Sequence, residues 1–150
     1  KPVILNVQAL GGKKMMQFAL ESLLNNSPNT QLVAVTILTS LDDDDLQMME
    51  MNISTKNLVS SLAKLTKETG LSGVVCSSEE IKLVREVCGK NFKIIVPGIR
   101  PEGSDKNDQK RIMTPKEAIS LGADHLVIGR PITESKDPRK TTKEIVNSIK

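Results

Sequence analysis

The chain has 150 residues, 38% of them hydrophobic and 26% charged, which is the balance of a soluble globular protein with one well-buried core. The net charge of +3 is too small to indicate a polyanionic partner, and the lysines are spread along the chain. With two Phe and no Tyr or Trp, the chain lacks the aromatic platforms on which single-stranded nucleic acids stack. We therefore expect no nucleic-acid partner.

The two cysteines, Cys76 and Cys88, fit neither a metal-binding pattern nor a disulfide framework. We interpret them as reduced residues of the core. The sequence shows no signal peptide, and its apolar runs are too short to span a bilayer. We expect a cytoplasmic protein without a membrane partner.

Short apolar runs alternate with amphipathic stretches along the whole chain. The expected elements are, in order, strand 3–7, helix 13–25, strand 32–38, helix 42–51, helix 54–69, strand 73–76, a helix from 77 or 78 to 89, strand 93–96, helix 114–121, strand 125–128 and helix 137–149. Ser54 is the expected N-cap of its helix, and Thr114-Pro115 is a helix start. The acidic run 42–45 suits the first turn of a helix better than a metal site.

Five strand–helix units in this order predict an α/β fold with a parallel sheet. The strands are β-branched and apolar on both faces, as in a sheet covered on both sides. Two architectures remain open: a doubly wound open sheet, or part of a (β/α)8 barrel, which usually needs about 250 residues. The chain begins directly in a strand, which favours an incomplete barrel.

Ligands of parallel α/β folds bind beyond the carboxyl ends of the strands. The segments at those ends hold Gly, Ser, Thr and Arg but no Cys, His or acidic cluster, and they are 8–12, 39–40, 77–78, 97–100 and 129–131. This composition suits an anion rather than a metal. At the last strand, Gly129 lets a ligand approach, Arg130 offers a planar fork to phosphate oxygens, and Pro131 starts a helical turn. The alternative is that Arg130 forms a surface ion pair.

The long polar loop 101–113 is either an active-site lid or disordered. Gln109 can donate and accept hydrogen bonds over a bound ligand, or can be a solvated loop residue. Asp105, Lys106 and Asp108 resemble a catalytic set but lie in this polar loop, so we do not assign them to catalysis. His125, the single histidine, directly precedes a strand and is interpreted as structural.

Five stretches resemble orotidine 5′-phosphate decarboxylase of the bacterial type, in its C-terminal portion. They are ILNVQALGGKKMM (4–16), VAVTILTS (33–40), GLSGVVCSSEE (70–80), VPGIRPEGSDKNDQKRIMTP (96–115) and GADHLVIGRPIT (122–133). The resemblance implies a (β/α)8 TIM barrel that acts as a homodimer. This chain would cover about five units, the fourth to the eighth, of a single barrel domain. The implied reaction is the cofactor-free, metal-free decarboxylation of orotidine monophosphate to uridine monophosphate in pyrimidine synthesis.

The resemblance also implies roles for six residues as substrate contacts. The phosphate-binding arginine falls on Arg130 with the amide of Gly129, and the glutamine that bridges phosphate and pyrimidine falls on Gln109. The remaining contacts fall on Arg100, Thr39 and Pro97. Gln8 stands where this family often has His, and we expect little cost from it.

The catalytic residues of the family are absent from the sequence. They form an Asp/Lys network with an Asp-x-Lys-x-x-Asp motif on the third strand, and residues 1–150 contain no counterpart. One hypothesis is therefore a decarboxylase whose N-terminal strands are not in this chain, which alone would be inactive. The alternative is a non-catalytic partial barrel that binds nucleotide phosphate or needs a complementing N-terminal piece. A third hypothesis, another sugar-phosphate decarboxylase or synthase of the same suprafamily, fits the PGIRP and DQKR motifs less well.

Overall fold

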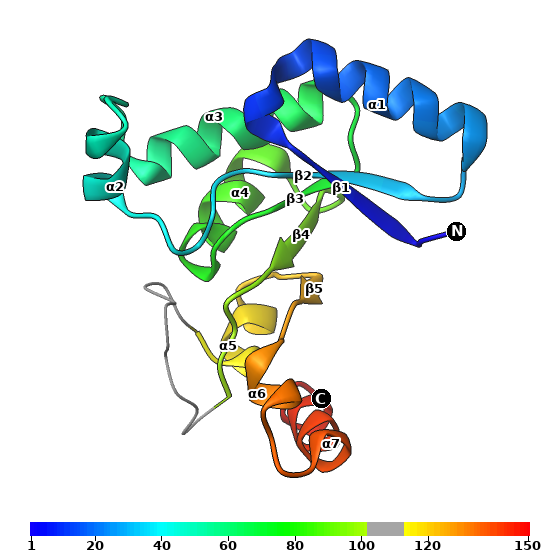
Figure 1. Ribbon diagram of the computed structural model, residues 1–150, viewed down its shortest axis with the longest axis vertical. Helices are drawn as coiled ribbons and strands as arrows, with labels where there is room; N and C mark the ends of the chain where they lie inside the picture. The colour runs from blue at the N-terminus through cyan, green and yellow to red at the C-terminus, as the bar shows by residue number, and fades with distance from the viewer. Residues whose placement is uncertain (102–112) are drawn as a thin grey trace.

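The computed structural model describes residues 1–101 and 113–150, which form one five-stranded sheet with its helices (Figure 1). The elements are β1 (Ile4–Gln8), η1 (Ala9–Gly11), α1 (Gly12–Asn26), β2 (Gln31–Val35), α2 (Asp43–Met48), α3 (Thr55–Glu68), β3 (Gly73–Val75), η2 (Ser78–Glu80), α4 (Ile81–Cys88), β4 (Lys93–Val96), α5 (Pro115–Ser120), β5 (His125–Leu126), α6 (Arg130–Thr133) and α7 (Pro138–Ser148). The α/β prediction is confirmed.

The strand order separates the two architectures that the sequence left open. All four strand pairs are parallel, and the order β1-β2-β3-β4-β5 follows the chain without reversal. A doubly wound sheet reverses its order at a switch point, where its ligand binds. A sheet that grows in one direction, one unit after another, is instead the arrangement of a (β/α)8 barrel.

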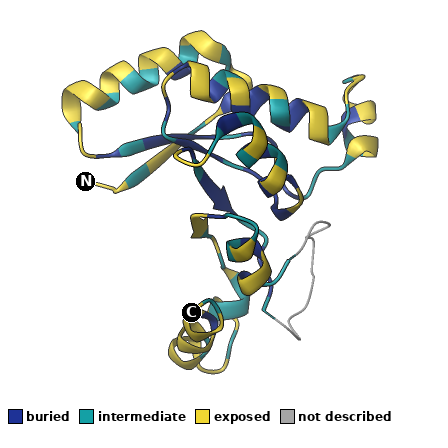
Figure 2. Cartoon of the chain, turned by 180° about the vertical axis from the view of Figure 1, so that it is seen from behind, coloured by how far each residue is buried: buried dark blue, intermediate teal, exposed yellow. Residues whose placement is uncertain are grey.

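One face of the sheet packs against the helices. Paired residues of parallel strands point to the same side, and the register aligns Ala34, Val74 and Ile94, all fully buried in the hydrophobic core. The central helix α3 adds Val59 and Ala63 to this core. Figure 2 shows the buried residues where β2–β4 meet α3 and α4, whereas α1 and α7 are mostly exposed. Cys76 and Cys88 are buried in the same core, as expected.

The expectation that every strand is covered on both faces is wrong for the two outer strands. Leu5 of β1 is 44% exposed, and Val127, directly after β5, is 50% exposed. Within the described residues, β1 pairs only with β2, and β5 pairs only with β4. Strands β2–β4 have neighbours on both sides, and their apolar residues are largely buried.

β3 ends one residue earlier than predicted, and two other strands end earlier still. β2 ends at Val35 rather than at 38, because the chain turns away after Thr36, and Leu41 N–H closes a turn onto the Leu38 carbonyl. β5 has only His125 and Leu126, because the chain enters α6 soon afterwards.

The predicted helix starts are confirmed at α2, α3 and α5. The Ser54 hydroxyl accepts a hydrogen bond from Asn57 N–H, and Thr114 forms a capping box with Glu117. The acidic run behaves as expected, since Asp42 caps α2 and closes a capping box with Asp45. In the described part of the chain, none of the helices is long and apolar enough to cross a membrane.

Candidate functional site

Two glycine- and arginine-containing segments meet at neighbouring strand ends. The segment 97–100 follows β4, and 129–130 follows β5, two residues beyond the bond from Val127 N–H to the Val96 carbonyl at 2.9 Å. Gly98 has φ +75°, a conformation that strongly favours glycine, so the turn after β4 depends on this residue. Parallel pairing thus brings the two predicted anion-binding segments to the same edge of the sheet.

The segment after β5 forms the expected helical turn. Gly129 is the N-cap of α6, and its carbonyl accepts from Ile132 and Thr133 N–H at 2.8 and 3.1 Å. A Cβ atom built on Gly129 meets nothing within 4 Å, so packing inside the protein does not require glycine here. The open space in front of this backbone is available to a ligand. Arg130 is half-buried at the first position of α6.

Arg100 lies deeper than a surface arginine and is only 6% exposed. Its Nη1 donates to the carbonyl of Ile99 at 3.0 Å, and its backbone N–H donates to the carbonyl of Met113 at 3.0 Å. The second bond joins the two ends of the polar loop for which the sequence left two alternatives, a lid or a disordered segment. Arg100 therefore connects the end of β4 to the residue that leads into α5.

Buried polar side chains also collect at the carboxyl ends of β2 and β3. Thr36 is fully buried, and its hydroxyl and its N–H both donate to the Val75 carbonyl, at 3.0 and 3.1 Å. Thr39 is 8% exposed. The hydroxyl of Ser77 accepts from Glu79 N–H at 3.2 Å, while the buried hydroxyl of Ser78 has no hydrogen-bond partner among residues 1–101 and 113–150.

Thr36 was not singled out from the sequence, and Glu80 was expected only as an acidic residue of a helix first turn, although both are buried. For Thr36 the available signal was its position directly after the apolar strand β2, whereas Glu80 lies at the end of η2, several residues beyond β3. Their burial depends on packing between strands and helices, which the sequence pattern does not reveal.

The structure places five of the six predicted substrate contacts at strand ends. Thr39 follows β2, Pro97 and Arg100 follow β4, and Gly129 and Arg130 follow β5. Pro97 is half-buried. Gln109 lies outside the described residues, as do Asp105, Lys106 and Asp108. His125 begins β5 opposite Ile95, at the amino end of the strand, and is exposed.

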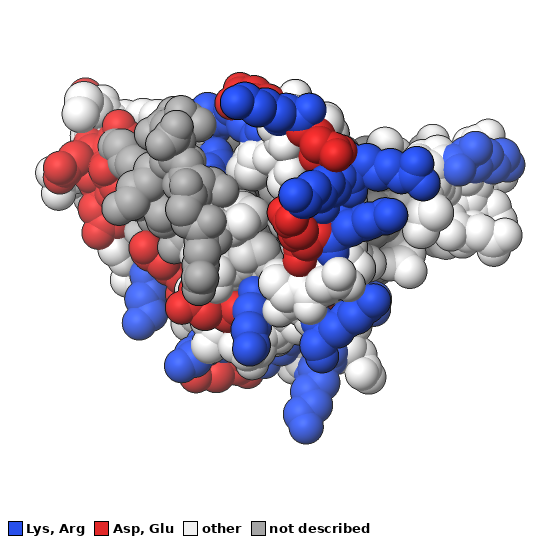
Figure 3. All heavy atoms as spheres, turned by 90° about the horizontal axis from the view of Figure 1, so that it is seen from below, with Lys and Arg blue, Asp and Glu red and all other residues white. Residues whose placement is uncertain are grey.

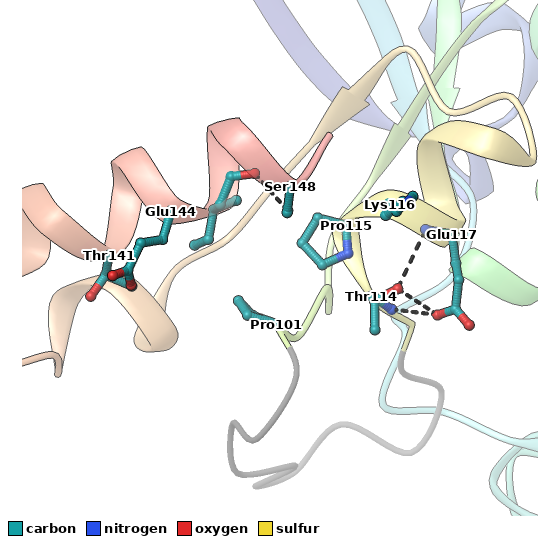
Figure 4. A pocket seen from close by; sticks show the side chains of 9 residues that line it. Pro101, Thr114, Pro115, Lys116, Glu117, Thr141, Glu144 and Ser148 are labelled. Atoms are coloured by element: carbon teal, nitrogen blue, oxygen red, sulfur yellow. Dashed lines mark hydrogen bonds between the residues drawn. The ribbon is translucent and has the colours of Figure 1, made fainter. Parts of the chain in front are cut away.

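A separate cavity of about 450 Å³ lies between α5 and α7 (Figure 4). Its lining residues are Pro101, Thr114, Pro115, Lys116, Glu117, Thr141, Glu144, Ile145 and Ser148, with none of the six predicted contacts among them. Its hydroxyls already have partners: Thr114 bonds Glu117, Thr141 bonds Ser135 and Ser148 bonds the Ile145 carbonyl. The hydroxyl and the N–H of Thr114 hold the pKa of the Glu117 carboxyl below its usual value. The strand ends, not this cavity, hold the arginines that suit an anion.

Charge is mixed on the face seen in Figure 3, where basic and acidic side chains are interspersed. Across residues 1–101 and 113–150, no three His, Cys, Asp or Glu side chains are grouped so that they could hold a metal ion.

The fold and these strand ends define a class: barrel-type α/β proteins whose ligand site lies at the carboxyl ends of parallel strands. The family model described as "Orotidine 5'-phosphate decarboxylase / HUMPS family" matches residues 3–145. The chain belongs to this family, as the resemblance predicted.

Two solved structures support the assignment. The chain is 36% identical to orotidine 5′-phosphate decarboxylase from Lactobacillus acidophilus, with a TM-score of 0.83, covering 98% of this chain and 63% of that one. An uncharacterized conserved protein from Geobacillus kaustophilus is 33% identical, with a TM-score of 0.79, covering 99% of this chain and 64% of that one. The chain thus spans less than two thirds of the length of either protein.

Proposed function

We propose that this chain provides the phosphate and pyrimidine contacts of an orotidine 5′-phosphate decarboxylase, which converts orotidine monophosphate to uridine monophosphate and CO2. One observation carries the proposal: in a member of this family, parallel pairing brings 97–100 and 129–130 to adjacent strand ends. Similarity to the Lactobacillus acidophilus decarboxylase supports the choice of reaction.

In this proposal, Arg130 holds the substrate phosphate. Its guanidinium presents parallel N–H donors to two phosphate oxygens, and the open space at Gly129 lets the phosphate reach the backbone. The bonds that hold Arg100 to Ile99 and Met113 restrain its backbone and side chain before a ligand arrives. Binding then loses less conformational entropy than it would with a free side chain.

Thr39, Pro97 and Gln109 complete the proposed contacts. Thr39 offers a hydroxyl that can donate or accept at the end of β2, and Pro97 offers an apolar surface to the pyrimidine ring. Gln109 would bridge phosphate and base. These contacts position the nucleotide, and binding energy from the phosphate can orient the distant carboxylate for reaction.

The bond-breaking step requires residues that this chain does not contain. The family's Asp/Lys network belongs to strands that we place before β1, in a single (β/α)8 barrel of which this chain forms the fourth to eighth units. The carboxy-lyase activity is therefore assigned to the complete protein, a cytoplasmic homodimer that needs neither cofactor nor metal. Residues 1–150 alone would bind nucleotide without decarboxylating it.

Calorimetric titration of the chain with uridine monophosphate tests this function. Arg130→Ala should weaken binding at least tenfold, since a charged hydrogen-bonded pair contributes about 1.5–3 kcal/mol. The matched control is Arg139→Ala, which removes an exposed arginine from α7 and should leave the affinity unchanged.

Two further ligands make the result specific. Uridine lacks the phosphate. It should bind the wild type weakly, and its affinity for Arg130→Ala should be the same. A sugar phosphate without a base should bind more weakly than uridine monophosphate. Equal affinity of wild type and Arg130→Ala for uridine monophosphate would remove Arg130 from the phosphate site. Preference for the sugar phosphate would favour another activity of the family.

A further inference from the structure

We infer that the cavity between α5 and α7 is a second ligand site, which takes a small apolar molecule carrying an amine and is coupled to the nucleotide site through Arg100. None of the described residues that line this cavity is a predicted substrate contact. The second site itself does not depend on the proposed function, and only its coupling to nucleotide binding rests on that function.

The cavity has an apolar floor. Its volume of about 450 Å³ lies within the range of small-molecule sites, which are mostly lined by apolar side chains. Pro115 is buried, and Ile145, the buried residue of α7, is 7% exposed. Figure 4 shows Pro101 and Pro115 across the cavity from Glu144 of α7. An apolar group that enters between them loses contact with water, which favours binding.

The polar groups around this floor favour a cation. The three hydroxyls of the lining already form hydrogen bonds with groups of the protein. The charged side chains of the lining are Lys116, Glu117 and Glu144, so two carboxylates stand against one ammonium group. An anionic ligand would meet more repulsion than attraction there, whereas an amine would meet the reverse.

The carboxylate of Glu144 can accept such an amine. It pairs loosely with Lys140 at 4.0 Å, and the two side chains are 65% and 72% exposed, so this ion pair contributes little. On the α5 side of the cavity, Thr114 donates to Glu117 and holds the pKa of its carboxyl below the usual value. Glu117 therefore adds negative charge, and Glu144 provides the contact.

The cavity is joined to the candidate site through the backbone. Pro101 directly follows Arg100, and Thr114 directly follows Met113. The Arg100 N–H donates to the Met113 carbonyl at 3.0 Å, so this bond connects the two segments that enter the cavity lining. A ligand in contact with both segments stabilises the arrangement that holds Arg100. It should therefore raise the affinity for nucleotide, and nucleotide should raise the affinity for the ligand by the same factor.

A backbone-amide NMR titration of the 150-residue chain tests the site with probes that share one apolar group. Phenylpropylamine should give saturable shift changes at Thr141, Ile145 and Ser148. Phenylpropionate should bind about tenfold more weakly, because its carboxylate meets the two carboxylates of the lining. Methylamine, which lacks the apolar group, should give no saturable change at these amides.

Two variants separate the proposed contact from nonspecific attraction. Glu144→Gln should weaken the binding of phenylpropylamine about threefold, since an exposed ion pair is lost while the shape of the side chain is kept. The matched control Glu21→Gln neutralises an exposed carboxylate of α1 and should leave the affinity unchanged. Equal losses in the two variants would overturn the role of Glu144.

Coupling is measured on the same samples. With saturating phenylpropylamine, the wild type should bind uridine monophosphate about fivefold more tightly, the lower end of usual coupling between sites. An unchanged affinity for uridine monophosphate overturns the coupling.

The remaining outcomes are equally decisive. Phenylpropionate binding as tightly as phenylpropylamine overturns the cationic class of ligand, and the absence of saturable changes in α5 and α7 overturns the site. Amine binding to a chain that does not bind uridine monophosphate overturns the proposed function and keeps the site.

Discussion

Ser78 is a buried residue, only 2% exposed, whose hydroxyl forms no hydrogen bond with any residue in the described part of the chain. Ser77 beside it is different, because its hydroxyl accepts the N–H of Glu79 at the start of η2. We therefore expect these two adjacent serines to contribute with opposite sign to stability.

We predict that Ser78→Ala raises the free energy of unfolding by about 1 kcal/mol, because a desolvated hydroxyl without a partner is removed. Ser77→Ala should lower it by about 1 kcal/mol through loss of the cap. Urea denaturation followed by circular dichroism measures both. A larger loss in Ser78→Ala than in Ser77→Ala would show that Ser78 makes a contact that this account omits.

The burial and the hydrogen bonds of individual side chains were the hardest features to predict from the sequence. The motifs indicated the strand-end positions of Arg100 and Arg130, and the structure confirms those positions. They did not indicate that Arg100 is almost fully buried or that Thr36 is bonded twice to Val75. Both depend on contacts between units far apart in sequence, which local periodicity does not encode. The roles of all six substrate contacts stay predictions.

Helix α4 is joined to the amino ends of β4 and β5 by one arginine. Arg85 donates to the carbonyls of Gly89, Phe92 and Gly122 and pairs with Asp124, whose carboxylate also accepts from Ile94 N–H at 2.8 Å. Arg85 is four-fifths buried, with 19% of its side chain exposed. This contact lies opposite the strand ends of the candidate site, where barrels place residues that stabilise the fold.

We predict that Arg85→Ala lowers the free energy of unfolding by about 3 kcal/mol, because several carbonyls and a carboxylate lose a charged donor. Arg139→Ala on the exposed surface of α7 should change it by less than about 0.5 kcal/mol. The same denaturation experiment compares the two. Equal free energies of unfolding in the two variants would mean that water can satisfy the partners of Arg85 with little loss of stability.

Helix and strand elements were largely predictable. Capping residues at 42, 54 and 114 mark the helix starts, because Asp, Ser and Thr side chains satisfy the first free N–H groups. Strand ends were less predictable. Ile37, Leu38, Val127 and Ile128 continue the apolar runs of the strands before them, and only the turns that follow end the pairing.

The chain as a unit is an open row of five strand–helix units. Strand order, which no single element reveals, separated the barrel from the doubly wound sheet. The exposed outer strands corrected the expectation of a fully covered sheet, since that expectation treated each strand as if it had two neighbours. The cavity between α5 and α7 could not be predicted, because it depends on how α7 packs on α5.

The most direct test of the account is a backbone-amide NMR titration with uridine monophosphate. It compares the strand ends with the cavity between α5 and α7. We predict saturable shift changes at Gly98, Arg100, Gly129 and Arg130, which disappear in Arg130→Ala. Changes confined to Thr114, Thr141 and Ser148, or no saturable change at any amide, would contradict the claim that this chain binds a nucleotide phosphate at its strand ends.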